Sequence, residues 1–156
     1  MLKQKNTSVA CEKFKILYFK ELEKYSEALI VDIKTILAIK PNPDVNDASI
    51  ELFTDELGEG WLAIKMTFNG KHKEVDEVKQ GIYCGLIVTV IDITGLPVTD
   101  FCTFEEIFIS DIIANIVNNW FLDCWKKANG HNYSLKVEAF NYGDFGDGGI
   151  INLNMN

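Results

Sequence analysis

The feature that most constrains the fold is the apolar pattern of residues 103–128. Apolar residues recur here at intervals of three and four and would cover most of the circumference of a helix. They are Phe104, Phe108, Ile109, Ile112, Ile113, Ile116, Val117, Trp120, Phe121, Cys124 and Trp125. Asp111, Asn115, Asn118, Asn119 and Lys126 mark the predicted solvent side. Because so apolar a helix must bury most of its surface, we expect it to pack across a sheet.

A second helical pattern occupies about residues 8–39, and Pro41 and Pro43 end it. One apolar face runs along its length, and Lys and Glu fill the other side. The residues of that face are Phe14, Leu17, Tyr18, Leu22, Tyr25, Leu29, Ile33 and Ile36. A run of about 30 residues is long for one helix, so the pattern leaves open a break near Ser26.

Elsewhere, apolar and polar residues alternate with the period of two that is typical of strands. We predict strands at about 50–54, 61–68, 71–78, 82–92, 133–140 and 150–154, and a loop at 41–49. Leu62, Ile64, Met66 and Phe68 share one face of their strand. Asn69-Gly70 favours a tight hairpin turn. The charged strand 71–78 is predicted at an edge, and the apolar strand 82–92 at the centre.

These patterns predict one α+β domain over residues 1–156, and a chain of 156 residues is long enough to bury a sizeable core. The domain has two layers. A mostly antiparallel sheet forms one layer, and a long N-terminal helix and a long apolar second helix pack on it.

The charge of the chain is strongly negative. It has 23 acidic and 15 basic residues, every basic residue is lysine, and the net charge is −8. A net negative chain without arginine is a poor ligand for phosphates, which argues against nucleic-acid binding. Apolar runs are too short to cross a membrane, so we expect no membrane association. The charge is uneven, because residues 1–40 carry a net +3 and the remainder a net −11.

Residues with catalytic or metal-binding chemistry are few. The two histidines, His72 and His131, have no metal-ligand spacing, and no nucleophile or phosphate-loop motif is present. Cys11, Cys84, Cys102 and Cys124 are widely spaced, which favours buried free thiols in a reducing cytosol. Charged residues follow Met1 closely, so we expect no signal peptide and a cytoplasmic location. The sequence therefore predicts no enzyme, cofactor or metal.

Two segments are candidate partner-binding surfaces. Residues 41–60 contain six acids and no lysine: Asp44, Asp47, Glu51, Asp55, Glu56 and Glu59. Trp61 follows directly. The glycine-rich segment 141–149, predicted as a hairpin loop, adds Tyr142, Asp144, Phe145 and Asp147. A negative surface steers a basic partner toward itself, and aromatic residues anchor contacts. Scattered surface acids also keep a domain soluble, so both interpretations stay open here.

In size, acidity and lack of catalytic motif, the chain resembles the cytosolic immunity proteins with which bacteria neutralise toxin domains. That resemblance implies binding to a basic, nuclease-like toxin through the acids of 44–59.

Two alternatives remain. An enzyme or small-ligand site could form between helix and sheet, with Asp92 and His131 or Tyr133 as first candidates. A homo-oligomer could pair through the strand Ser49–Thr54 or Lys71–Val78. The sequence leaves the oligomeric state open.

Overall fold

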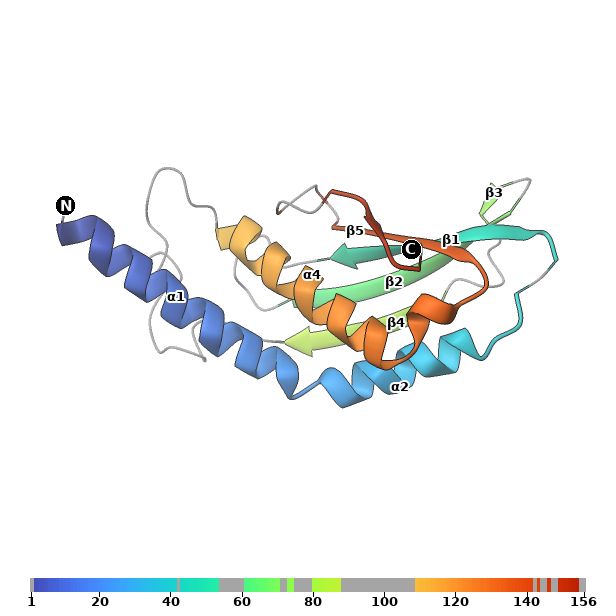
Figure 1. Ribbon diagram of the computed structural model, residues 1–156, viewed down its shortest axis with the longest axis horizontal. Helices are drawn as coiled ribbons and strands as arrows, with labels where there is room; N and C mark the ends of the chain where they lie inside the picture. Colours follow the sequence, from blue (N-terminus) through green and yellow to red (C-terminus); the bar gives the residue numbers. More distant parts are fainter. Residues whose placement is uncertain are drawn as a thin grey trace.

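The computed structural model describes residues 2–41, 43–53, 61–70, 73–74, 80–87, 109–141, 143, 146 and 149–154. They form an α+β fold, as the patterns predicted (Figure 1). The helices are α1 (Leu2–Glu23), α2 (Ser26–Leu37), α4 (Ile109–Lys127) and the short 3₁₀ helix η3 (Gly130–Asn132). The strands are β1 (Val45–Phe53), β2 (Trp61–Gly70), β3 (Lys73–Glu74), β4 (Gln80–Ile87), β5 (Lys136–Asn141) and β6 (Ile151–Asn152).

The predicted N-terminal helix is two helices, with the break at Lys24 and Tyr25. Two contacts with α4 hold Ser26, the first residue of α2, in place. Its hydroxyl accepts a hydrogen bond from Trp120 Nε1 at 2.8 Å, and its carbonyl lies 4.0 Å from Cys124 Sγ. The break lets α1 and α2 both lie against α4 with different directions (Figure 1). The apolar face stays continuous across it, because Phe14, Tyr18, Leu22, Leu29, Ile33 and Ile36 are all buried.

The sheet is mixed, whereas a mostly antiparallel sheet was predicted. Its strand order is β3-β2-β1-β5-β6, and β4 also pairs with β2. The central pair β1 and β5 is parallel, with Ala48 opposite Val137 and Leu52 opposite Asn141. Parallel neighbours need a long connection, and here β2, β3, β4 and α4 all lie between the two strands in the chain.

The predicted Asn69-Gly70 turn is wrong. Both residues belong to β2, where they pair with β1 and also with Glu74 and Lys73 of β3. Residues 71–72, which connect β2 to β3, lie outside the described part. Asn69 instead uses its side chain across the sheet, where Nδ2 donates to Asp47 Oδ1 at 2.8 Å. Cross-strand pairing on both sides of β2 overrides the local turn preference.

Other strand predictions also need correction. β1 begins at Val45, inside the predicted loop, because its first residues pair with both β2 and β5. Among the described residues β4 pairs with β2 alone, so β4 does not hold the central position predicted for it. Helix α2 contacts β4. β5 begins at Lys136 rather than 133. Residues 75–79 and 88–92, and the predicted helix start at Thr103, lie outside the described part.

The core lies between the helices and one face of the sheet. Facing residues of three neighbouring strands are buried together: Ala48, Ile50 and Leu52 on β1, Leu62, Ile64, Met66 and Phe68 on β2, and Val137 and Ala139 on β5. The predicted face of residues 62–68 is thus confirmed. α4 crosses this face in Figure 1 and buries Trp120, Phe121 and Trp125 there. Within the described residues, none of the helices combines the length and apolarity needed to span a bilayer.

Candidate functional site

The structure describes only part of the predicted partner-binding set. Asp44, Asp47 and Glu51 are described, and the backbone of Trp61 opens β2. The remaining predicted residues lie outside the described part: Asp55, Glu56, Glu59, Tyr142, Asp144, Phe145 and Asp147. The described residues therefore fix where the two predicted segments leave the sheet, and the contacts of three of their acids.

The acids of β1 lie beside lysines. Asp47 and Glu51 alternate with the buried residues of β1 and so lie on the sheet face away from the core. In the strand register, Asp47 is opposite Lys136 and Glu51 is opposite Lys65. Lys136 also forms an ion pair with Glu138 at 2.8 Å. On this face acidic side chains lie opposite lysines, so Asp47 and Glu51 add little net negative potential. Asp44, just before β1, is exposed.

Lysine-free acidic segments are connected to one end of the sheet. β1 ends at Phe53, which pairs with Ala63 near the start of β2, and Trp61 pairs with Ile87, the last residue of β4. β5 ends at Asn141, beside Leu52 of β1. Neighbouring strands lie about 4.8 Å apart, so the segments 54–60 and 142–148 begin at adjacent strand ends. The sequence placed them 80 residues apart in two separate turns.

The segments attached to this end contain no lysine. Residues 54–60, 88–108 and 142–149 hold nine acids: Asp55, Glu56, Glu59, Asp92, Asp100, Glu105, Glu106, Asp144 and Asp147. We call the end of the sheet formed by Phe53, Trp61, Ile87 and Asn141 the acidic strand end. The N-terminal part of α1 extends past this end (Figure 1), and Lys3 and Lys5 belong to its first two turns.

Helix α4 holds the glycine-rich segment against its own first turns. The Gly146 N–H donates to Asp111 Oδ1 at 2.8 Å. Gly146 has a φ of +82°, and a Cβ there would lie 2.7 Å from Asn115 Oδ1, so both the conformation and the close approach require glycine. Asp111, predicted as a solvent-side residue, thus positions the backbone of a segment that the sequence singled out for binding.

A buried amide pair fixes the end of β5. Asn141 Nδ2 donates to Asn118 Oδ1 at 3.2 Å, and the two residues are only 4% and 6% exposed. Asn118 was predicted on the solvent side of α4, and this is wrong. Sequence reasoning missed the pair because a polar residue on a mostly apolar helix usually faces water. A signal was present: Asp111, Asn115 and Asn118 recur at helical spacing and form one polar stripe.

Of the residues of the predicted enzyme alternative, His131 and Tyr133 are described and Asp92 lies outside the described part. Ile87, after which Asp92 follows, lies at the acidic strand end, whereas His131 lies in η3, after the far end of α4. His131 is exposed. The Tyr133 hydroxyl is buried without a hydrogen-bond partner among the described residues, and burial raises the pKa of Tyr133. Burial likewise raises the pKa of the Cys124 thiol, which is free and buried, as predicted.

No group of three or more metal-ligating side chains comes together within the described residues. No protein-family model matches the chain, and neither a curated protein nor a solved structure is significantly similar to it.

Proposed function

We propose that this chain is a small, acidic, cytoplasmic protein-binding module that binds a basic partner at the acidic strand end. One observation carries the proposal: β1 and β5 are parallel and in register, so both predicted binding segments start side by side. Of these segments, residues 54–60 hold three acids and residues 142–148 hold two, and neither range contains a lysine. Five acids therefore belong to segments that leave the sheet at neighbouring strand ends.

The residue types at this end suit a protein interface. Clustered carboxylates steer a positively charged partner and repel acidic ones, which gives specificity and a fast association rate. Trp61, Tyr142 and Phe145 belong to or adjoin the same segments and would supply aromatic anchors, which dominate the energy of many interfaces. The sheet, and the buried hydrogen bond from Asn141 of β5 to Asn118 of α4, support the strand ends from which the segments leave.

The resemblance to immunity proteins makes this proposal more specific. A nuclease-like toxin presents a basic cleft for phosphates, and a group of carboxylates can occupy that cleft by matching its charge. In this version the chain is a bacterial immunity protein, and blocking the cleft neutralises the toxin. Charge, size and the arrangement of the acidic segments support it.

The structure supports the two alternatives less well. The enzyme alternative needs Asp92 to lie close to His131 or Tyr133. The strand that precedes Asp92, β4, ends at the acidic strand end, whereas η3 lies near the other end of the sheet. The homo-oligomer alternative loses most of one of its surfaces, because residues 49–52 of β1 pair with strands on both sides and are no edge. Its other surface, 71–78, is described only at Lys73 and Glu74.

The test compares two sets of charge reversals with the same change in net charge. One variant replaces Asp55, Glu56 and Glu59 with lysine. The control replaces Glu12, Glu27 and Asp123, exposed acids on the three helices, with lysine. Each protein is used to capture partners from the cells that express it, and the affinity for the captured protein is measured at several salt concentrations.

We expect a basic protein to bind the wild type and the control with affinities within about threefold, and the reversal at 55–59 to weaken binding about a hundredfold. Reversing Asp144 and Asp147 should weaken binding of the same protein, because both segments leave one strand end. Affinity that does not depend on salt, or full binding by both reversal variants, would contradict the proposal.

A further inference from the structure

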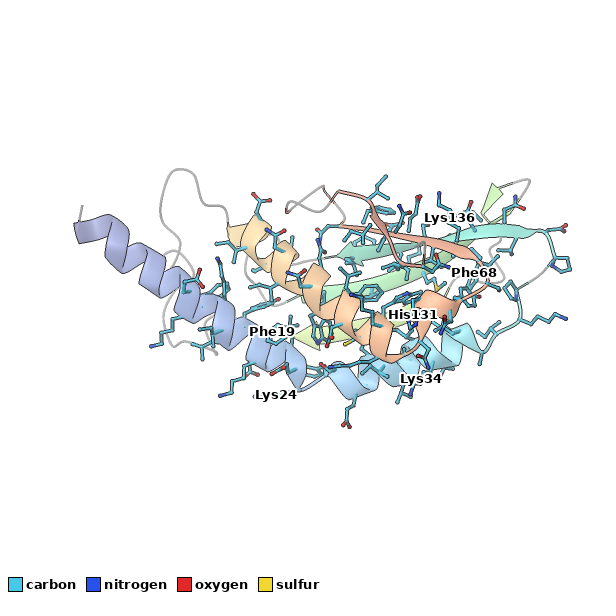
Figure 2. The ribbon with its side chains drawn as sticks, in the orientation of Figure 1. Phe19, Lys24, Lys34, Phe68, His131 and Lys136 are labelled. Carbon is cyan, nitrogen blue, oxygen red and sulfur yellow. The ribbon has the colours of Figure 1, made fainter. Side chains whose placement is uncertain are left out.

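We draw no further inference here: the strongest candidate, the open apolar groove between α1 and α4 that Ile16, Phe19 and Ile116 line (Figure 2 labels Phe19), has both lysines and a glutamate along its rim, and nothing in the described part of the chain shows what covers it.

Discussion

At the scale of single residues, the polar side chains at the contact between α4, β5 and the glycine-rich segment have the most specific roles. Asn118 and Asn141 hydrogen bond to each other at 4–6% exposure, and Asp111 holds the Gly146 N–H. Each lies on the side of α4 or at the strand end that faces the glycine-rich segment. Burying a polar group costs free energy unless it is hydrogen bonded, so these residues favour the arrangement of α4 against β5 in which their hydrogen bonds form.

The Asn118→Ala variant tests this role. It removes the acceptor of a buried hydrogen bond, and we expect the free energy of unfolding to fall by about 1–3 kcal/mol. Asn119→Ala, at the next position, is the matched control because Asn119 is exposed; its cost should stay within about 0.5 kcal/mol. Urea unfolding measures both. Equal losses in the two variants would mean that the amide pair contributes no specific stability.

At the scale of elements, the break between α1 and α2 decides how the helices fit together. In a single continuous helix, the apolar face of residues 14–36 would not stay in contact with α4 along its whole length. The break at Lys24 and Tyr25 redirects α2, and Ser26 supplies an acceptor to the Trp120 indole there. Trp120 is 1% exposed, so its N–H has no access to water as a substitute.

Ser26→Ala should therefore lower the free energy of unfolding by about 1–3 kcal/mol, since it leaves a buried donor unpaired. In a Trp120→Phe background, where the N–H is already gone, the same change should cost much less. Ser134→Ala, at an exposed position before β5, serves as the control. Chemical denaturation of the four variants and the wild type closes this cycle, and strictly additive costs would refute the coupling.

At the scale of the whole molecule, several described groups respond to alkaline pH in the same direction. Burial raises the pKa values of Cys124 and Tyr133, and the carboxylates of Asp123 and Glu138 raise those of Lys127 and Lys136. A pKa that is higher in the folded than in the unfolded state means that the folded chain binds the proton more tightly. The resulting stability is complete below the unfolded pKa and is lost as the pH rises through the folded pKa.

We therefore expect the free energy of unfolding to fall as the pH rises above about 9, near the ordinary pKa of a thiol. Urea unfolding between pH 7 and pH 11 measures this fall. Tyr133→Phe removes a hydroxyl that has no described partner, so it should cost little at pH 7 and should make the alkaline fall shallower. A stability that increases between pH 9 and pH 11 would contradict the prediction.

Periodicity alone predicted the kinds of most described elements and the buried faces of several of them. The residues Leu62, Ile64, Met66 and Phe68 share the core face as predicted, and so do most apolar residues of the first helical pattern. These features are local, because the periods of helix and strand directly set which side chains point the same way. The uneven charge and the two candidate binding segments also follow from the chain itself.

Only the tertiary structure decided which strands are neighbours. The parallel pairing of β1 with β5, the inclusion of Asn69-Gly70 in β2 and the burial of Asn118 all depend on contacts between residues far apart in the chain. Local preferences are worth a fraction of a kcal/mol per residue, whereas pairing and burial act over whole elements. That non-local pairing brings Leu52 and Asn141 side by side, so that the two acidic segments on which the proposed function depends leave the sheet at neighbouring strand ends.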